Sequence, residues 1–499
     1  MALGMARAGP EPYSRPMSLQ DHRTGAIATT PRRIADLPGP AGLPWLGNVL
    51  SIKLEHLHLH AEAWAREYGA PYRFRIGASQ FVVVTAPEAI AAILRDRPNG
   101  FQRRDKLNAT ASELGFGGLF TSNGATWKRQ RPMVLAGLDP THIKAFFPTL
   151  AKVTERFAGR WRRAAERGEA IDLQSDLMRY TVDVTAGLAF GTDINTIESD
   201  DEVIQSHLDK ILPAMFKRLL APFPYWKWIR LPADRALDGH LAALRTAVDG
   251  FIHGARERLA AQPALRDKPT NLIEAMVAAR DRDGSEVTDE DVSGNVLTML
   301  LAGEDTTANT MAWMIWLLHR NPQATQRVVE EVHGVLGDAR MPTRHEDLAR
   351  LDFVEACAHE AMRIKPVAPI NIQQAVHDTV VDGVAIPQGT AVMCLMRPAA
   401  VDEQHFANAG AFQPERWLAG GTSSGAAASS AKRVAMPFGA GPRICPGRYL
   451  ALAELKMLAA MVYASFTVDE VTAPGGGDAA ERLATTMSPV GLTLRLSVR

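Results

Sequence analysis

Apolar positions recur every three or four residues, with polar positions between them, through most of the chain between residues 124 and 337. This spacing is the period of an amphipathic helix, so the middle of the chain is predicted to be helix after helix. Breaks are expected where proline or glycine interrupts the pattern, near Pro140 and at 168–171, 222–232 and 281–285. The predicted fold class is therefore mainly α.

The regions on either side contain shorter, mixed elements. The pattern predicts a helix at 54–68, strands within 72–86, a helix at 87–95, a loop-like stretch at 97–123, strands and turns at 366–440, a helix at 449–463 and a closing hairpin near 488–491. No internal repeat or linker divides the chain. We expect a single large helix-rich domain with small β-sheets over residues 38–499.

Two segments are not expected to join the packed domain. Residues 1–37 are rich in Pro, Arg, Gly and Ser and contain no apolar run suited to a signal sequence, which predicts a disordered leader. Residues 420–431 are rich in Gly, Ser and Ala, which predicts a flexible insertion.

No segment reaches the length of a membrane span, so we expect a cytoplasmic protein without a membrane anchor.

Composition narrows the classes of function. The chain is 46% hydrophobic and 22% charged, as in a globular protein with an ample core, and its formal net charge of zero gives no overall attraction to nucleic acid. The three cysteines, Cys357, Cys394 and Cys445, are too few and too far apart for a disulfide framework or a Cys-x-x-Cys zinc site. We therefore expect a reducing compartment.

The most informative stretch is FGAGPRICPG, from Phe438 to Gly447, which places Cys445 in a glycine-rich loop directly before a helix. Backbone N–H groups and the positive end of the helix dipole favour a thiolate at such a position. The glycines leave room for a large flat group, and Arg443 offers a cation to an anion beside the sulfur. Haem fits these features, with its iron on the sulfur and its propionates near the arginine.

The pattern Phe-x-x-Gly-x-Arg-x-Cys-x-Gly resembles the haem-binding loop of the cytochrome P450 family. Alone, the stretch could also be a buried cysteine after a glycine-rich turn. The resemblance extends from about Pro38 to the C-terminus. It implies a P450 fold in which thiolate-ligated haem b is buried between a long central helix and the cysteine loop. It also implies that Cys445 ligates the iron and that Phe438 and Ala302 contact the haem.

The long helix is predicted to start after Thr288, which is followed by Asp-Glu-Asp and has the residue types of a capping box. It would run for about 30 residues and be about 45 Å long. In its middle lies Ala302-Gly-Glu-Asp-Thr306, where the glycine costs about 1 kcal/mol relative to alanine. Thr306 can donate to the carbonyl of Ala302 and loosen the helix locally. A hydroxyl and a carboxylate beside such a groove suit bound dioxygen and the delivery of protons to it.

This segment matches the oxygen-activation motif of the family, (Ala/Gly)-Gly-x-(Asp/Glu)-Thr. The resemblance implies that Thr306 hydrogen-bonds the bound oxygen and that Asp305 gates protons, so these two are the candidate catalytic residues. Glu304 falls at the variable position and is interpreted as a solvated or ion-paired side chain. A lone acid–threonine pair on a helix is ordinary, so this interpretation depends on the cysteine loop.

Three cationic or donor side chains are expected to anchor the haem propionates. Trp127 and Arg131 stand four residues apart on one helix face, and the family pattern Trp-x-x-x-Arg implies that both contact propionates, together with Arg443. One departure matters: the family often has an arginine five residues before an aspartate, and this chain has Gln373 before Asp378. One propionate contact is therefore expected to be neutral or to come from another residue.

A second helix carries a structural motif. Glu360 and Arg363 have the i, i+3 spacing of an ion pair on one helix face. Together with Arg416 they resemble the buried Glu-x-x-Arg and arginine triad of the family, which implies a structural role behind the cysteine loop. An isolated pair of this kind would be a surface pair of little value.

Candidate residues for a mostly apolar substrate pocket come from four separate segments. They are Phe120, Thr298, Leu301, Ala302, Val367, Ala368, Ile370, Thr486 and Met487. Core packing is an equally good interpretation of each.

The resemblance implies a monooxygenase, which inserts one oxygen atom from dioxygen into a small apolar organic substrate by hydroxylation or epoxidation. No flavin or iron–sulfur module is recognisable, so a separate ferredoxin or flavodoxin with its reductase is expected to supply electrons. A basic patch for that donor, or merely a solvated face, is expected at Lys128, Arg129, Arg433 and Arg448. The alternatives are a peroxide-driven peroxygenase of the same fold and a non-catalytic haem-binding or sensing protein.

Overall fold

The computed structural model describes residues 30–199, 203–221, 223–418 and 427–499, and it is mainly α-helical. The helices are α1 (Leu57–Tyr68), α2 (Pro87–Arg95), α3 (Asp105–Glu113), α4 (Gly124–Ala136), α5 (Pro140–Glu166), α6 (Leu173–Phe190), α7 (Val203–Leu220), α8 (Pro232–Ala261), α9 (Leu272–Arg280), α10 (Asp289–His319), α11 (Pro322–Leu336), α12 (His345–Leu348), α13 (Asp352–Ile364), α14 (Arg397–Ala400), α15 (Ala427–Ala435) and α16 (Arg448–Ser465).

The strands of the described residues form four small sheets. They are β1 (Arg32–Arg33), β2 (Tyr72–Ile76), β3 (Ser79–Val84), β4 (Phe101–Gln102), β5 (Ile171–Asp172), β6 (Ile370–Ala375), β7 (Thr379–Val381), β8 (Val384–Ile386), β9 (Ala391–Leu395), β10 (Phe466–Thr472), β11 (Glu481–Leu483), β12 (Met487–Pro489) and β13 (Thr493–Val498). The largest sheet has the order β2-β3-β9-β6-β4, and the others are β1-β8-β7, β10-β13-β5 and the β11-β12 hairpin.

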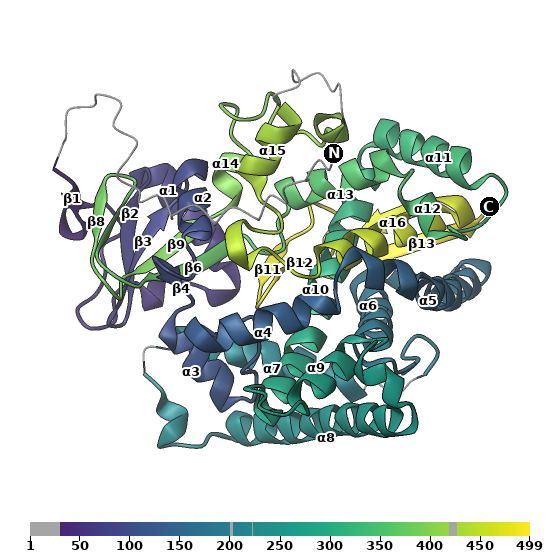
Figure 1. The fold of residues 1–499 in the computed structure, drawn as a ribbon. Coiled ribbons are helices and arrows are strands. Elements are labelled where there is room, and N and C mark those ends of the chain that lie inside the picture. Colours follow the sequence, from purple (N-terminus) through teal and green to yellow (C-terminus); the bar gives the residue numbers. More distant parts are fainter. Residues whose placement is uncertain (1–29, 200–202, 222, 419–426) are drawn as a thin grey trace, which may run out of the picture.

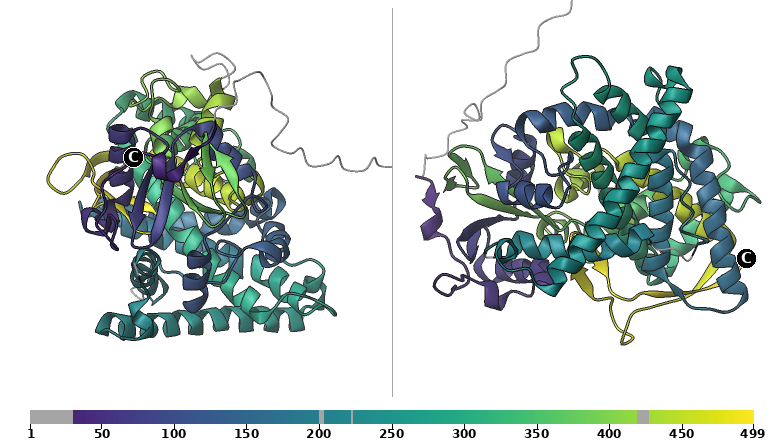
Figure 2. Two further views of the ribbon diagram at one scale, coloured as in Figure 1. Left: turned by 90° about the vertical axis from the view of Figure 1, so that its left-hand side faces the viewer. Right: turned by 90° about the horizontal axis from the view of Figure 1, so that it is seen from below.

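The strands of the first two sheets form a lobe on the left in Figure 1, together with α1 and α2, and the part to its right is mostly helical but also contains β11, β12 and β13. Helix α8 runs along the lower edge, where it packs on α7 and α9 (Figures 1 and 2). Helix α10 lies inside the helical part of the molecule, where it contacts α6, α9, α13 and α16. The core is therefore built around α10.

The start of α10 has the predicted cap. The Thr288 hydroxyl accepts from the backbone N–H of Asp291, and the Asp291 carboxylate accepts from the backbone N–H of Thr288, both at 3.0 Å. These bonds satisfy two of the N–H groups that a helix start leaves free. The helix then continues to His319 without a break.

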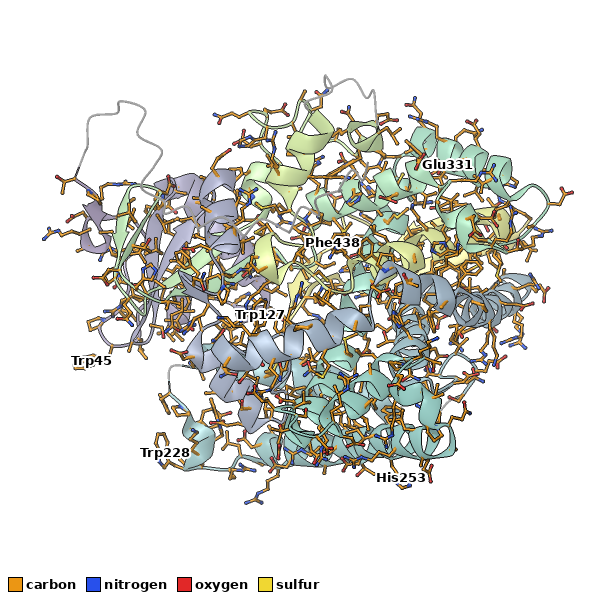
Figure 3. The ribbon with its side chains drawn as sticks, viewed as in Figure 1. Trp45, Trp127, Trp228, His253, Glu331 and Phe438 are labelled. Carbon is orange, nitrogen blue, oxygen red and sulfur yellow. The ribbon has the colours of Figure 1, made fainter. Side chains whose placement is uncertain are left out.

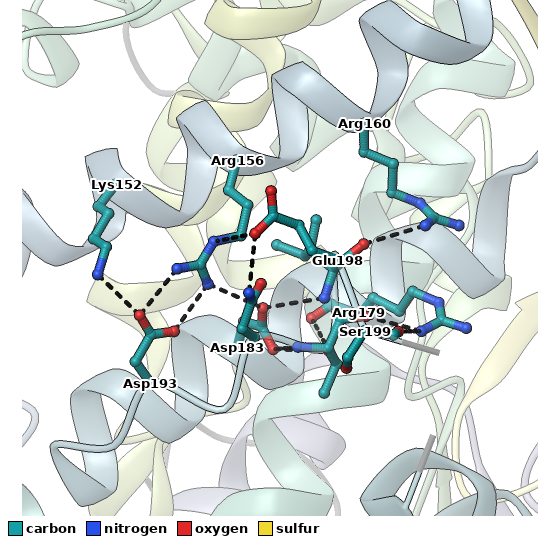
Figure 4. Close-up of polar contacts among 11 residues, drawn as sticks. Lys152, Arg156, Arg160, Arg179, Asp183, Asp193, Glu198 and Ser199 are labelled. Atoms are coloured by element: carbon teal, nitrogen blue, oxygen red, sulfur yellow. Dashed lines mark hydrogen bonds and ion pairs between the residues drawn. The ribbon is translucent and has the colours of Figure 1, made fainter. Parts of the chain in front are cut away.

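Polar contacts fix the connection after α6 against α5 (Figure 4). Arg156 and Lys152 both donate to the Asp193 carboxylate, at 2.8 to 2.9 Å. These donors lower the pKa of Asp193 well below its usual value. The buried Asp183 carboxylate accepts from the backbone N–H and the hydroxyl of Thr196. Asp193 and Thr196, which follow α6, are thereby held against α5 and α6.

Three segments differ from the sequence-based expectation. Residues 32–36, inside the expected disordered leader, form β1 and a 3-10 turn, and β1 pairs with β8, so the ordered chain begins before residue 38. Residues 1–29 lie outside the described part. Of the expected insertion at 420–431, residues 420–426 also lie outside the described part, and residues 427–431 belong to α15. The loop-like stretch at 97–123 contains α3.

No helix in the described ranges is both long and apolar enough to cross a lipid bilayer.

Candidate active site

The cysteine loop is held between two helices. A 3-10 turn (Gly441–Arg443) precedes Cys445, whose backbone N–H donates to the Phe438 carbonyl at 3.0 Å, and α16 starts at Arg448. Gly441 has φ +70°, and a Cβ there would lie 2.5 Å from the Leu94 carbonyl oxygen at the end of α2. Only glycine fits this close approach.

The pKa of the Cys445 thiol differs from the expectation. Burial raises its pKa above the usual value, although the backbone N–H of Gly447 and the charges of Arg131 and Arg448 lower it. The prediction that the protein alone favours the thiolate is therefore wrong, because desolvation outweighs the helix terminus. A metal ion deprotonates the thiol that coordinates it, so binding of iron at Cys445 would offset the effect of burial.

On α10, the Thr306 hydroxyl donates to the Ala302 carbonyl at 2.9 Å. The neighbouring Asp305 carboxylate accepts from the Thr486 hydroxyl at 3.2 Å. Ala302 is exposed, whereas Leu300 and Thr307 on the same helix are buried. Accessible space therefore adjoins the helix at Ala302, beside the turn that carries the acid and the hydroxyl.

Two neighbours in this motif have roles that the sequence did not indicate. A Cβ on Gly303 would lie 2.4 Å from the Thr185 hydroxyl of α6, so the glycine permits α6 and α10 to cross closely. Glu304 is only 2% exposed, so it is not a solvated side chain. Its backbone carbonyl accepts from the Thr181 hydroxyl at 3.0 Å, which ties the same crossing together.

The predicted propionate anchors meet one another. Arg131 donates to the carbonyl of Ile444, next to Cys445, at 2.7 Å. The Arg443 guanidinium lies 4.7 Å from the centre of the Trp127 ring, a cation–π contact. Trp127 on α4 and Phe438 both lie near the middle of the molecule in Figure 3. The structure thus joins α4 to the cysteine loop through these side chains.

Two further arginines, which the sequence analysis missed, join Arg131 and Arg443 in what we call the arginine cluster. Arg97 donates to the carbonyls of Leu94 and Ala440, and the Arg103 guanidinium adjoins that of Arg443. Burial and the other arginines of the cluster lower the pKa of Arg97 to about 9 and those of Arg103 and Arg443 to about 10. The positively charged guanidinium groups of the cluster thus lie near one another in a part of the protein that is shielded from water.

Within the described residues, no carboxylate forms an ion pair with any member of the arginine cluster, and Nε of Arg103 and of Arg443 is buried without a hydrogen-bond partner. Leaving buried charges uncompensated costs several kcal/mol each, on the order of 3–5. The cluster therefore fits a ligand with two negative charges. Haem, with two propionates and an iron that takes a thiolate, matches both the cluster and Cys445.

Gln373 lies beside this cluster. It is fully buried, its amide donates to the Asn371 side chain, and Arg103 donates to the same Asn371 oxygen at 3.4 Å. The neutral Gln373 side chain therefore has the Arg103 cation beside it, which comes from another segment of the chain.

Glu360, Arg363 and Arg416 form a buried group. Arg363 makes two bonds to the Glu360 carboxylate, at 2.7 and 2.8 Å, and Arg416 makes a third at 3.2 Å. The Trp417 indole and the backbone N–H of Gln413 also donate to that carboxylate. This one carboxylate thus holds α13 to the segment that precedes the cysteine loop.

The pocket candidates divide into two groups. Phe120 is exposed, with the Arg103 guanidinium 4.6 Å from its ring centre, and Ala368 is exposed too. Thr298, Leu301, Val367 and Ile370 are half-buried. Thr486 is almost fully buried.

Met487 departs from the expectation because it is fully buried. Its sulfur accepts from Arg397 at 3.8 Å, and Arg397 itself lies between the Glu62 and Glu481 carboxylates. Met487 therefore packs behind the hairpin instead of lining accessible space.

The basic residues do not all face outward. Arg129 donates to the Asp291 carboxylate at the start of α10, at 3.0 Å. It therefore links α4 to α10 and is not part of the expected basic patch. Lys128 and Arg433 are exposed, and Arg448 is half-buried with its guanidinium on the Tyr449 ring.

Comparison with known proteins places the chain in a family. The Cytochrome P450 family model matches residues 37–492. A pentalenene oxygenase of Streptomyces avermitilis is 26% identical, over 92% of this chain and 97% of the relative. The cyclooctat-9-en-7-ol 5-monooxygenase of Streptomyces melanosporofaciens is 28% identical, over 85% and 87%.

A solved structure agrees at the level of the fold. The heme domain of cytochrome P450DA is 24% identical and superposes with a TM-score of 0.79, over 93% of this chain and 98% of that one. The cysteine loop, the arginine cluster and the extent of the family match all point the same way. The chain belongs to the cytochrome P450 family.

Proposed function

We propose that this chain inserts one oxygen atom from dioxygen into a small apolar molecule, by hydroxylation or epoxidation. The observation that carries the proposal is the pair of Asp305 and Thr306 on α10, beside the exposed Ala302. A hydroxyl and a carboxylate with defined hydrogen bonds can hold and pass protons at a fixed place.

Haem b bound through the Cys445 thiolate supplies dioxygen activation, because electron donation by the thiolate favours O–O cleavage. Around it, the Thr306 hydroxyl is held by the Ala302 carbonyl and keeps both lone pairs available to accept a hydrogen bond. Asp305 is its neighbour on α10 and is oriented by Thr486. We assign proton supply to Asp305 and proton positioning to Thr306.

The arginine cluster and Trp127 are assigned to the haem propionates. Many members of the family contact a propionate through an arginine at the position of Gln373, and we assign that contact to Arg103 in this chain. The Nε of Arg103 is buried without a partner, and its Nη reaches the Asn371 side chain that Gln373 also contacts. Each charge-assisted bond of this kind contributes about 1.5–3 kcal/mol.

The substrate class follows from the accessible candidates and from the relatives. Phe120, Leu301 and Val367 are apolar and at least partly exposed. Two Streptomyces relatives are named for the oxidation of pentalenene and of cyclooctat-9-en-7-ol.

Electrons would come from a ferredoxin or flavodoxin in the cytoplasm, docking on Lys128, Arg433 and Arg448 near the cysteine loop.

The test replaces Thr306 by alanine and uses Thr310→Ala as the matched control. Thr310 is also a threonine of α10, and its hydroxyl donates to the Thr306 carbonyl at 2.7 Å. Thr306→Ala should retain haem and substrate, consume the electron donor, and release hydrogen peroxide in place of most of the product. Thr310→Ala should keep the wild-type ratio of product to electrons.

Three outcomes would contradict the proposal or part of it. Full coupling in Thr306→Ala would remove the proton-positioning role. Wild-type turnover with hydrogen peroxide alone, and none with a reductase system, would favour the peroxygenase alternative, and failure to turn over with either would favour a haem-binding or sensing protein.

A further inference from the structure

A surface cavity lies between the end of α4 and α9. Its volume is about 490 Å³, within the range of pockets that take small organic ligands, about 300–1,000 Å³. The two helices pack against each other (Figure 1), and Gly137 permits their close approach, because a Cβ there would lie 2.7 Å from the Leu272 side chain. None of the residues that line the cavity is assigned to haem, oxygen or substrate.

Most of the cavity wall is apolar, and it comes from α4, α9 and the loop before α9. The apolar lining residues are Met133, Ala136, Pro269, Ala275, Ala278 and Ala279. His142 of α5 closes one side and pairs with the Asp139 carboxylate at 3.1 Å. Because apolar groups gain free energy when they leave water, these walls suit the apolar body of a ligand.

The rest of the lining is mostly cationic. Arg266, Lys268 and Arg282 line the cavity, and Asp267 is the one carboxylate among its described lining residues. Arg266 has a counter-charge in Asp281, at 3.4 Å. Lys268 and Arg282 are exposed and form no ion pair with any described residue. Two cations beside an apolar wall are therefore available to a ligand.

Hydrogen bonds fix the segments that carry these two cations. The backbone N–H of Lys268 donates to the Ala264 carbonyl at 3.1 Å. After α9, the backbone N–H of Ser285 donates to the Arg282 carbonyl at 3.0 Å, and the Ser285 hydroxyl donates to the Ala279 carbonyl at 2.7 Å. A backbone that is ordered before binding lowers the entropy cost of taking up a ligand.

We propose that this cavity binds an amphipathic organic anion, whose apolar body packs against α4 and α9 and whose carboxylate, sulfonate or phosphate group meets Lys268 and Arg282. Charge complementarity carries the choice of an anion, since the two unpaired cations outnumber the single lining carboxylate. A neutral apolar molecule would leave both cations without a counter-charge, and a cationic ligand would be repelled.

An occupant of the cavity would also act on the helix that carries two haem anchors. Met133 stands two residues after Arg131 on α4, and Arg131 donates to the Ile444 carbonyl beside Cys445. A ligand that packs on Met133 and on α9 therefore holds the end of this helix in place. The proposal does not depend on oxygen insertion, because binding is measured without turnover.

The test is isothermal titration calorimetry of the haem-loaded protein with naphthalene-2-sulfonate. Phenylimidazole is present throughout, because its imidazole ligates the iron and its ring occupies the space beside Ala302. We expect the wild type to bind one sulfonate per chain. The double variant Lys268→Glu/Arg282→Glu should bind about tenfold more weakly, since the reversed charges repel the anion.

Two further variants keep the test independent of misfolding and of net charge. Asp267→Asn removes a like charge and should bind the sulfonate about twofold to threefold more tightly, a gain that a misfolded protein would not show. Ala136→Phe fills the cavity from the α4 side without a change of charge and should weaken binding. The matched controls, Arg66→Glu on α1 and Arg163→Glu on α5, reverse exposed cations elsewhere and should bind as the wild type does.

The neutral analogue naphthalene-2-sulfonamide should bind the wild type several-fold more weakly than the sulfonate. Absence of sulfonate binding by the wild type, equal affinity for the two compounds, or equal losses in the control variants would overturn the proposal. So would wild-type sulfonate binding by the double variant together with slower electron transfer from a ferredoxin, because Lys268 and Arg282 would then belong to the surface that meets the electron donor.

Discussion

The Thr486 hydroxyl, in the turn of the β11-β12 hairpin, donates a hydrogen bond to the Asp305 carboxylate of α10 at 3.2 Å. Behind it, the Asn309 amide donates to the Thr486 oxygen at 3.4 Å, and Gln174 of α6 donates to Asn309 at 2.9 Å. The proposed proton-supplying acid is thus oriented by a chain of neutral donors.

Replacing Thr486 by valine keeps the shape of the side chain and removes this donor. We expect the ratio of product to electrons consumed to fall about fivefold, the equivalent of one hydrogen bond of about 1 kcal/mol. Haem content and substrate binding should not change. The control is Ser488→Ala in the same hairpin, whose hydroxyl donates to the Arg482 carbonyl. Equal coupling in the two variants would show that Thr486 does not orient Asp305 for the reaction.

Replacing Arg103 by alanine should weaken haem binding far more than replacing Gln373. Loss of one charge-assisted bond corresponds to about a tenfold to hundredfold faster transfer of haem to an acceptor such as apomyoglobin. Arg131→Ala should behave like Arg103→Ala. The control is Arg104→Ala, since Arg104 contacts Phe81 and Ser79. Transfer rates that are the same for Arg103→Ala and Gln373→Ala would mean that Arg103 does not hold a propionate.

Replacing Glu360 by glutamine should lower the free energy of unfolding by about 3–5 kcal/mol, because it leaves two buried arginines without their counter-charge. The control is Asp36→Asn, which breaks the exposed pair of Asp36 with Arg33 and should leave the stability nearly unchanged, because solvent screens the two charges. Denaturant unfolding of both variants measures the difference. Similar midpoints would show that the buried group contributes no more than a surface pair.

Glu454 of α16 gives a pH-dependent prediction. Burial raises its pKa from 4.5 to about 8, and a contact with Thr307 of α10 lowers it only in part. The folded protein therefore binds the proton more tightly than the unfolded chain, so its contribution to stability is full below pH 4.5 and is lost as the pH rises through about 8.

Glu454→Gln cannot lose a proton, so its stability relative to wild type should increase between those two pH values, by at most about 1.4 kcal/mol per pH unit. Unfolding by denaturant at pH 5 and at pH 8 measures the change. A difference between the two proteins that stays constant with pH would contradict the raised pKa.

Features encoded by neighbouring residues were predictable from the sequence. The cap at Thr288, the bond from Thr306 to Ala302 and the cysteine loop before α16 each depend on residues within a few positions of one another. Helix α10 has the predicted start because its capping residues are local and no proline interrupts it.

Features produced by long-range packing were not predictable. Arg97 and Arg103 meet Arg131 and Arg443 only in the folded chain, and no local sequence pattern indicates this meeting. Burial of Glu304 depends on the crossing of α6, which no local pattern around Glu304 reveals.

The central claim is that Cys445 ligates the haem iron. The other two cysteines are fully buried in the core, and burial raises the pKa of Cys394 to about 12 and that of Cys357 well above its usual value. The most direct test is the absorption spectrum of the reduced carbon-monoxide complex of the wild type and of three serine variants. The account predicts that Cys445→Ser loses the red-shifted band of thiolate ligation, while Cys357→Ser and Cys394→Ser keep it. An unchanged band in Cys445→Ser would contradict the account.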